Sequence, residues 1–580
     1  MTMFSTNEPS IQLCEKRPTV EIHLPDGRVL CGPRGTAVGY FLRSLPEWHT
    51  PQVVGAVVND ELRELTYPIS MDARVTPVTM ADADGARIYR RSITFLLEAA
   101  FEELYPDMML LVDHSVASGG FFCKVQNGAL TLEEIEKLEQ RMHQMVAEDL
   151  PLERRLVPLS EAIAYFQQKN YTDKVQLLKY RRRDMLVLYR LKDHQDYHHG
   201  YMVPSTGFLK WFALRPLQEG FVLQYPRRHS PDLLLPMPAY PKLLTAFRQY
   251  EQWLTRLGIE SVGALNAAIE AGRAKEVILI SEALHEQQIA EIAEQIVKRA
   301  DQARIVLIAG PSSSGKTTFS KRLAVQLLAQ GLSPFALEMD NYFVDRDKTP
   351  LDEDGKRDYE SMGALNTVVM QDHLKRLLAG EEVQLLHYNF KTGMSEPGEV
   401  MDLVPGQLII LEGIHGLNPE LLGSISPDQT FRIYVSCLTQ LNLDRYNRIS
   451  TTDSRLIRRI LRDARERGYS AQQTIERWEM VRRGEKRHIF PYQENADAMV
   501  NSALVFGLSL LGPLVEPLLR QVPHGTREYV EAKRLLSFLQ WFQPLDPQLV
   551  PDNSILREFI GDSILRDFKL WQHQNGQELQ

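Results

Sequence analysis

The sequence has few cysteines and none of the patterns that cysteine-dependent folds require. Four cysteines occur among 580 residues, they lie far apart, and no C-x-x-C pair is present. This absence excludes a zinc ribbon and a disulfide framework, and it favours a reducing compartment. We therefore expect a cytoplasmic protein.

Long apolar runs are also missing. The most apolar stretch, residues 503–515, is shorter than the ~20 apolar residues that a membrane-spanning helix needs, and Pro513 interrupts it. The start of the chain carries no apolar segment behind basic residues. We expect a flexible tail over residues 1–18, no signal peptide and no contact with a membrane.

A large excess of one charge is absent as well. The chain has 66 Lys and Arg residues against 75 Asp and Glu residues, a formal net charge of −9. Its surface as a whole therefore offers no strong attraction to nucleic acid. Two small basic clusters, residues 179–183 and 227–228, leave RNA binding open as a local property.

The composition is that of a folded, multidomain protein. Hydrophobic residues make up 44% of the chain and charged residues 24%, close to the average of globular proteins. At ~100–200 residues per domain, the length predicts three to five folded units.

The hydrophobic pattern of the first half changes once. Short alternating runs broken by turn residues predict a small β-rich module over residues 19–82. Amphipathic helices such as Ile93–Tyr105, mixed with strands such as Met185–Leu191, predict an α+β module over residues 86–230.

Two further segments read as helical. Residues 231–300 predict a connector with helices at Tyr240–Leu257 and Ser281–Lys298. Residues 511–580 predict a C-terminal segment of helices separated by prolines, and this segment carries no recognisable motif.

Between these segments, residues 301–510 alternate short apolar strands with helices. The strand IVLIAG is followed by a glycine loop, a helix over Lys316–Ala329 and the strand PFALEMD. This order is typical of a doubly wound α/β fold, in which a parallel sheet is covered on both faces. Ligands of such sheets bind at the carboxyl ends of the strands.

The glycine loop fits the nucleotide-binding pattern G-x-x-x-x-G-K-[ST]. Its glycines let backbone N–H groups point at phosphate oxygens, Lys316 reaches the β and γ phosphates, and the Thr317 hydroxyl ligates Mg²⁺. A simple glycine turn is the alternative, but the full pattern should arise by chance only ~0.02 times in such a chain. We predict that ATP and Mg²⁺ are bound by Gly310, Pro311, Ser312, Ser313, Ser314, Gly315, Lys316, Thr317 and Thr318.

Two carboxylates stand at the ends of strands of this region. Asp340 closes the run 335–339, where it could take a proton from an attacking hydroxyl; a cap or turn aspartate is the alternative. Glu412 closes QLIIL, where a P-loop protein keeps the acidic residue that holds Mg²⁺ or its water; an ordinary strand-end glutamate is the alternative.

A helical run, RLIRRILRDARERG, carries arginines at i, i+3, i+4 and i+7 beside an apolar face. Arginine pairs bidentately with phosphate oxygens and neutralises charge on a phosphoryl group during transfer. A solvated basic face is the alternative. Beside a P-loop we favour a lid formed by Arg455, Arg458, Arg459 and Arg462.

These motifs, in this order, resemble uridine kinases and the related phosphoribulokinases. The likeness is carried from about residue 304 to residue 506 by GPSSSGKT, MDNYF, YESMGALN, LLHYNF, LEGIHGLNP, the arginine run and FPYQENADAMVNSAL. The resemblance implies that Asp340 is the general base for a ribose 5′-hydroxyl and that Glu412 serves magnesium. It further implies an acceptor site formed by Asp340, Tyr342, Glu360, Tyr388 and Phe390. In this site Glu360 takes the place of the aspartate that contacts the sugar hydroxyls, and Tyr388 and Phe390 flank the base.

The departures from this family concern the acceptor. Where uridine kinases have Phe-Asp-His-Pro, this chain has Tyr359-Glu360-Ser361-Met362, and the histidine that reads the pyrimidine is replaced near Thr392-Gly393. A site without a polar partner for the base loses discrimination. Uridine is therefore one candidate among several acceptors.

The first half resembles two modules of threonyl-tRNA synthetases. Residues 19–80, with an LPDGR turn, are similar to the TGS β-grasp module, and residues 87 to about 178 are similar to the second additional domain. The H-x-x-x-H positions of that domain hold Arg91 and Phe95, and its C-x-x-x-H falls at His198 and Met202. One imidazole does not make a zinc site, so we expect no editing activity.

A group of histidines, His194, His198 and His199, stands near this position. The group could bind a metal, but we favour a surface loop with solvated or satisfied histidines.

Three hypotheses follow from the sequence. The leading hypothesis is a Mg-ATP-dependent kinase for the hydroxyl of a nucleoside, uridine- or cytidine-like, or of a related sugar-bearing small molecule. The alternative is an ATP-dependent, RNA- or ribosome-linked regulatory protein, which the TGS-like module motivates. A third hypothesis gives the first half only a regulatory role or contacts within a homo-oligomer.

Overall fold

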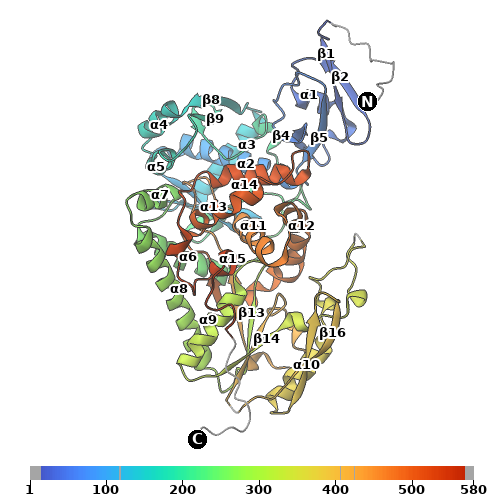
Figure 1. Ribbon diagram of the computed structural model, residues 1–580. Helices are drawn as coiled ribbons and strands as arrows, with labels where there is room; N and C mark the ends of the chain where they lie inside the picture. Colours follow the sequence, from blue (N-terminus) through green and yellow to red (C-terminus); the bar gives the residue numbers. More distant parts are fainter. Residues whose placement is uncertain (1–14, 117–118, 354, 405, 424, 569–580) are drawn as a thin grey trace, which may run out of the picture.

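The computed structural model describes residues 15–568 except 117, 118, 354, 405 and 424. The N-terminal sheet lies at one end of the molecule and the P-loop sheet toward the other, with the C-terminal helices between them (Figure 1). Most of the expected tail, residues 1–14, lies outside the described residues.

The first module is a mixed five-stranded sheet with strand order β2-β1-β5-β3-β4. The central pair β1 and β5 is parallel and the other pairs are antiparallel. Apolar side chains that alternate along the strands pack against helix α1 (Val38–Arg43). The predicted β-rich module is therefore present, and its assignment to the TGS family stays a prediction. Its strands are β1 (Thr19–His23), β2 (Val29–Pro33), β3 (Val53–Val58), β4 (Glu61–Arg63) and β5 (Ala73–Thr79).

The α+β module contains two antiparallel sheets, ordered β11-β12-β7-β6 and β10-β9-β8. Its longest helix, α2 (Ala83–Leu104), begins ten residues before the expected Ile93, because Ile88 and Tyr89 extend the buried face toward the N-terminus. The other elements are β6 (Leu110–Val116), β7 (Gly120–Val125), α3 (Leu132–Ala147), β8 (Glu153–Pro158), α4 (Leu159–Gln168), α5 (Thr172–Leu178), β9 (Met185–Leu191), β10 (His194–Asp196), β11 (Ala213–Leu217) and β12 (Gly220–Gln224).

The connector consists of helices α6 (Pro241–Leu257), α7 (Val262–Glu270) and α8 (Ala274–Val297). Helix α7 was not expected, and α8 begins before the predicted Ser281. Helix α8 packs along α9 of the P-loop region, so the connector forms part of the wall of that region (Figure 1).

The P-loop region is built on a five-stranded sheet with order β14-β17-β13-β18-β19, in which every pair is parallel. This confirms the predicted parallel α/β sheet. A separate hairpin, β15–β16, stands beside it (Figure 1). The elements are β13 (Ile305–Ala309), α9 (Lys316–Ala329), β14 (Pro334–Glu338), α10 (Thr367–Leu378), β15 (Val383–Asn389), β16 (Met394–Met401), β17 (Leu408–Glu412), β18 (Thr430–Ser436), α11 (Thr451–Arg462), α12 (Ala471–His488) and β19 (Ala498–Asn501).

The C-terminal segment folds back onto the rest of the molecule as α13 (Gly507–Leu519), α14 (Arg527–Leu539) and α15 (Arg557–Ile560). Helix α13 contains two prolines that were expected to separate helices, Pro513 and Pro517. All three helices pack on α11 or on each other, and one continuous apolar core joins them to the sheet and to the α+β module. In the described part of the chain, none of the helices has the length and apolar character needed to cross a bilayer.

Candidate active site

The glycine loop links the end of β13 to the start of α9, as the motif predicts. Ser313 and Gly315 take positive φ angles of 57° and 86°, which turns the loop sharply before the helix. Gly310 is required for a different reason: a Cβ there would lie 1.9 Å from the carbonyl oxygen of Val435 on the neighbouring strand. The backbone is thus curled in the manner of a phosphate-binding loop.

Thr317 and Glu412 meet at the carboxyl end of the sheet. Because β13 and β17 are parallel neighbours and Ile308 pairs with Glu412, the glutamate emerges beside the first turn of α9. The Thr317 hydroxyl donates a hydrogen bond of 3.2 Å to Oε1 of Glu412. These two oxygen donors are of the kind that Mg²⁺ prefers, so the residues fit the expected ion.

The environment of Glu412 also fits a cation site. Burial raises the pKa of this carboxyl group to about 7, and the Lys316 ammonium opposes that rise. A bound cation would favour the ionised form and bring the pKa down again. Lys316 itself donates a long hydrogen bond, 3.4 Å, to the carbonyl oxygen of Pro311.

Asp340 lies at the same edge of the sheet. It follows β14, whose last residue Glu338 pairs with Glu412 on β17, so the ends of three adjacent strands, β13, β17 and β14, supply the polar side chains. Solvent reaches Asp340, but surrounding protein atoms still desolvate its carboxyl group and raise its pKa, while Lys316 and Arg467 act in the opposite direction. A partly desolvated carboxylate beside a cation is suited to accept a proton.

Glu360, a residue of the predicted acceptor site, lies against helix α12. A Cβ on Gly484 would lie 2.5 Å from the Cβ of Glu360, so the close approach requires glycine there. Burial and the neighbouring Glu485 raise the pKa of Glu360 to about 7, against the effect of Arg459 and Lys316. The carboxyl group is therefore partly protonated at neutral pH.

The predicted base-flanking residues come together in an aromatic cluster. The rings of Tyr388 and Phe390 meet edge to face, with their centroids 5.1 Å apart, and the ring centroids of Phe343 and Tyr388 are 5.5 Å apart. Phe390 is 60% exposed. Tyr342 lies apart from this cluster: it is buried in the core, and its hydroxyl lies 3.1 Å from Nδ1 of His373. Its contact with an acceptor stays a prediction.

The arginine run of α11 is not a solvated basic face. Arg455 and Arg458 are 1% and 2% exposed. Arg455 donates from Nε to the carbonyl oxygen of Ser312 at 2.9 Å, and Arg459 donates to the Ser312 hydroxyl at 2.6 Å. These two guanidinium groups therefore bind the glycine loop itself, and their movement over a phosphate as a lid stays a prediction.

The other two arginines point elsewhere. Arg458 donates to the carbonyl oxygen of Ser502 at 2.9 Å and lies over the ring of Phe559. Arg462 is 3.6 Å from a carboxylate oxygen of Glu558 on α15. The expected four-residue stripe is thus divided between the loop and the C-terminal segment.

Glu485 on α12 was missed by the sequence analysis. Its Oε1 accepts a hydrogen bond of 3.1 Å from the backbone N–H of Ser312, and the same carboxylate pairs with Arg455. The available signal was the single acidic residue in the basic run RRGEKRH. Glu485 therefore occupies an amide of the loop that is expected to bind phosphate.

The C-terminal segment also reaches the loop, which no motif indicated. Glu558 accepts from the Thr318 hydroxyl at 3.0 Å and from its backbone N–H at 3.4 Å. The side chain of Ile555 packs on Gly315, where a Cβ would come within 2.5 Å of it. A carboxylate thus lies at the N-terminus of α9, a place that favours anions.

Comparisons with known proteins match two parts of the chain, the P-loop region and the N-terminal region. The model of the family described as "PRK: Phosphoribulokinase / Uridine kinase family" matches residues 305–505. Threonine–tRNA ligases match the N-terminal region. The ligase of Clostridium kluyveri is 31% identical over 192 residues, which are 33% of this chain and 30% of the ligase. The ligase of Burkholderia lata is 34% identical over 196 residues, 34% of this chain and 31% of the ligase.

The chain therefore spans about 30% of the length of the curated relatives it matches. A solved structure described as a "Possible Uridine Kinase" from Bacillus stearothermophilus covers 35% of this chain and 98% of its own, at 18% identity and a TM-score of 0.24. Neither value is high enough to indicate a shared function. The P-loop region, residues 305–505, matches the Phosphoribulokinase / Uridine kinase family, and the region before it is similar to threonine–tRNA ligases.

Proposed function

We propose that the chain is a Mg-ATP-dependent phosphotransferase that acts on the hydroxyl group of a nucleoside, of the uridine or cytidine type, or of a related sugar-bearing small molecule. The observation that carries the proposal is the convergence of Lys316, Glu412 and Asp340 at the carboxyl ends of adjacent parallel strands. The match of residues 305–505 to a kinase family supports the same reaction class.

Each of these residues has a distinct role in the proposal. Lys316 and the loop amides hold the β and γ phosphates, and Thr317 with Glu412 would hold Mg²⁺, which supplies charge neutralisation when bound. Asp340 takes the proton of the acceptor hydroxyl. The acceptor oxygen forms a bond to the γ phosphorus as the bond to the bridging oxygen breaks, which leaves ADP.

The acceptor side favours a molecule with a sugar and a flat ring. Glu360, with a pKa near neutrality, can donate or accept a hydrogen bond with a sugar hydroxyl. The exposed ring of Phe390 can stack on a planar base. Together they support a nucleoside more than a sugar phosphate, because a second phosphate would lie beside a carboxyl group.

The test is product formation by the purified chain with Mg-ATP and a panel of nucleosides plus ribulose 5-phosphate, read by mass. Lys316→Ala is the blank, because it removes the cation that holds the phosphates. A phosphorylated product that Lys316→Ala does not form would identify both reaction and acceptor. Absence of product with every acceptor, with ATP binding intact, would refute the nucleoside kinase.

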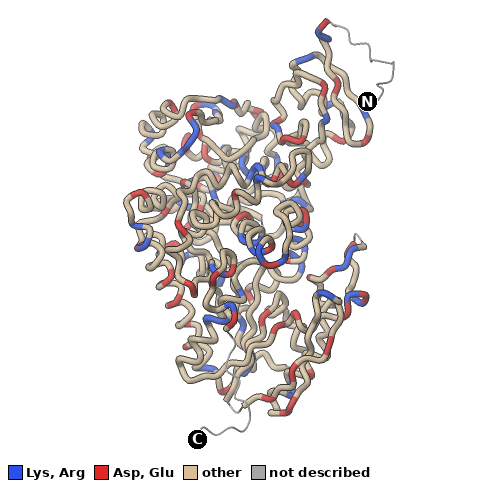
Figure 2. Tube along the Cα trace, viewed as in Figure 1, with Lys and Arg blue, Asp and Glu red and all other residues tan. Residues whose placement is uncertain are grey.

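A second candidate function is an ATP-dependent, RNA- or ribosome-linked regulator, favoured by the similarity of the N-terminal region to threonine–tRNA ligases. Its surface does not add to the case, because Lys and Arg are mixed with Asp and Glu along the N-terminal half (Figure 2). Arg228 pairs with Glu479 of α12, and Arg181 lies over the ring of Trp541, so both basic clusters contain arginines used inside the molecule. ATP turnover that rises with tRNA and needs no small acceptor would support the regulator.

A further inference from the structure

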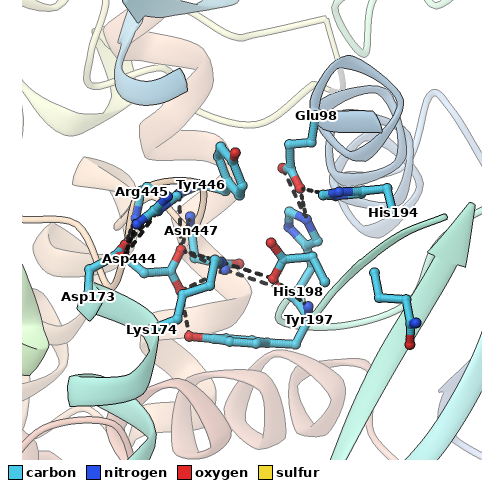
Figure 3. A network of polar contacts seen from close by, with 12 residues as sticks. Glu98, Asp173, Lys174, His194, Tyr197, His198, Asp444, Arg445, Tyr446 and Asn447 are labelled. Carbon is cyan, nitrogen blue, oxygen red and sulfur yellow. Dashed lines mark hydrogen bonds and ion pairs between the residues drawn. The ribbon is translucent and has the colours of Figure 1, made fainter. Parts of the chain in front are cut away.

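A buried polar cluster lies where the α+β module meets the loop between β18 and α11. Glu98 of α2 faces His194 and His198, and Lys174 of α5 lies between this group and Asp444 of the loop (Figure 3). Glu98, His194 and Asp196 are 1%, 4% and 0% exposed. The expected surface placement is therefore wrong for His194 and His198, which are buried, whereas the expectation of satisfied histidines agrees with their contacts to Glu98.

Three of these side chains have the spacing of ligands on one ion. One donor atom from each of Glu98, His194 and Asp196 lies within 4.8 Å of the other two. Nε2 of His194 is 3.4 Å from a carboxylate oxygen of Glu98. Two ligands on a tetrahedral zinc ion, each about 2.0–2.1 Å from the metal, are themselves about 3.3 Å apart. The pair is already at that separation.

Each of the three side chains is held by an outer partner. Nδ1 of His194 lies 2.5 Å from a carboxylate oxygen of Glu102, which leaves Nε2 directed at Glu98. Nζ of Lys174 lies 2.9 Å from Oδ1 of Asp196. Nε2 of His198 lies 3.2 Å from Oε1 of Glu98. Metal ligands in proteins are typically oriented in this way by a second shell of carboxylates and hydrogen bonds.

Two carboxylate oxygens of the cluster are buried and make no hydrogen bond to any of the residues that the structure describes, Oε1 of Glu98 and Oδ2 of Asp196. The Glu98 oxygen lies 3.2 Å from Nε2 of His198 in an ion-pair contact. A buried carboxylate oxygen without a partner carries a large desolvation cost. An ion bound between Asp196, Glu98 and His194 would remove that cost.

The charges of the network point the same way. Its five carboxylates outnumber its three Lys and Arg cations by two, before the imidazoles are counted. One divalent cation would balance this excess. The carboxylates are Glu98, Glu102, Asp173, Asp196 and Asp444, and the cations are Lys169, Lys174 and Arg445.

We propose that Glu98, His194 and Asp196 bind one divalent transition-metal ion that accepts mixed nitrogen and oxygen ligands, such as Zn²⁺. The site is separate from the glycine loop and joins α2 to β10 beside the loop between β18 and α11. The site also differs from the H-x-x-x-H positions of the related synthetase helix, which hold Arg91 and Phe95 in this chain. Phe95 cannot bind a metal and instead packs its ring on His194, and the proposed ligand Glu98 lies three residues further along α2.

The test is the metal content of the full chain. The protein is stripped with a chelator, loaded with Zn²⁺, desalted and analysed for zinc per chain, and its melting temperature is measured with and without the ion. We expect one Zn²⁺ per chain and a higher melting temperature with zinc. His194→Asn and Asp196→Asn should lose both. His143→Asn, a change of a partly exposed histidine on α3, is the matched control and should keep both.

A milder variant covers the case in which a ligand variant does not fold. Glu102→Gln keeps all three ligands and should weaken zinc affinity about 10–100-fold, because it alters only the outer partner of His194. Co²⁺ loaded in place of zinc adds a visible spectrum that reports its ligands. No stoichiometric zinc in the parent chain, or equal zinc in the parent and in His194→Asn, would overturn the proposal and leave protonated histidines as the source of charge.

Discussion

Replacing Glu558 by glutamine should tighten ATP binding. The Glu558 carboxylate occupies the hydroxyl and N–H of Thr318, at 3.0 and 3.4 Å, and lies 3.6 Å from Arg462. These donors belong to the nucleotide-binding motif, so a phosphate must displace the carboxylate or bind beside its negative charge. Glutamine keeps the shape and the accepting oxygen but removes the charge.

The size of the effect follows from these contacts. Hydrogen bonds to a charged group contribute about 1.5–3 kcal/mol each. Glutamine retains part of this interaction, so we expect the smaller value to be relieved, which corresponds to about a tenfold lower Kd for ATP. The release of Arg462 toward the nucleotide acts in the same direction.

The assay is titration calorimetry of the full chain with Mg-ATP. Glu516→Gln is a matched control, because Glu516 lies on α13, pairs with Arg520 directly after that helix and should leave the Kd unchanged. Weaker or equal ATP binding by Glu558→Gln would refute the reasoning. It would mean that Glu558 holds the loop in its binding form and does not compete with the phosphate.

Three further predictions concern catalysis, stability and pH. Asp340→Asn should lower kcat about 10²–10⁴-fold with little change in ATP Kd, since it removes only the base; unchanged kcat at saturating acceptor would contradict this role. Lys174→Met removes the ammonium group that pairs with two buried carboxylates, Asp196 and Asp444, and should cost about 3–5 kcal/mol of unfolding free energy. Lys192→Met breaks an exposed pair with Glu103 and should cost under about 1 kcal/mol; similar melting temperatures of the two variants would argue against this prediction. The raised pKa of Glu360 means that, between about pH 4.5 and pH 7, the folded chain holds a proton that the unfolded chain has lost. The contribution of this group to the unfolding free energy therefore falls as pH rises through that window. Glu360→Gln should reduce the dependence of the melting temperature on pH over this range.

The parallel sheet and the glycine loop could be predicted because local signals specify them. Continuous apolar strands and the G-x-x-x-x-G-K-T spacing do not depend on distant residues, and the sheet formed as expected. The ends of β14 and β17 then follow from parallel packing, which brings Asp340 and Glu412 to one edge.

The contacts between distant segments could not be predicted in this way. Glu558 reaches Thr318 across 240 residues of sequence, and Glu485 reaches Ser312 across 173. No periodicity or turn signal encodes such contacts. The partner of Tyr342 is a further example, because its place in a family motif gives no sign that His373 of α10 lies beside its hydroxyl in the core.

The loop that leads from β18 to the arginine helix is fastened to the α+β module. Arg445 pairs with Asp173 at 2.6 Å, Asn442 donates to the carbonyl oxygens of Val112 and Asp113, and Asp444 is buried against Lys174. The α+β module and the P-loop region, which are similar to separate protein families, are therefore joined by buried contacts. We expect that residues 301–510 expressed alone would lose stability, because Asp444 and Arg445 would lack their partners and the arginine helix that binds the glycine loop would be less well held.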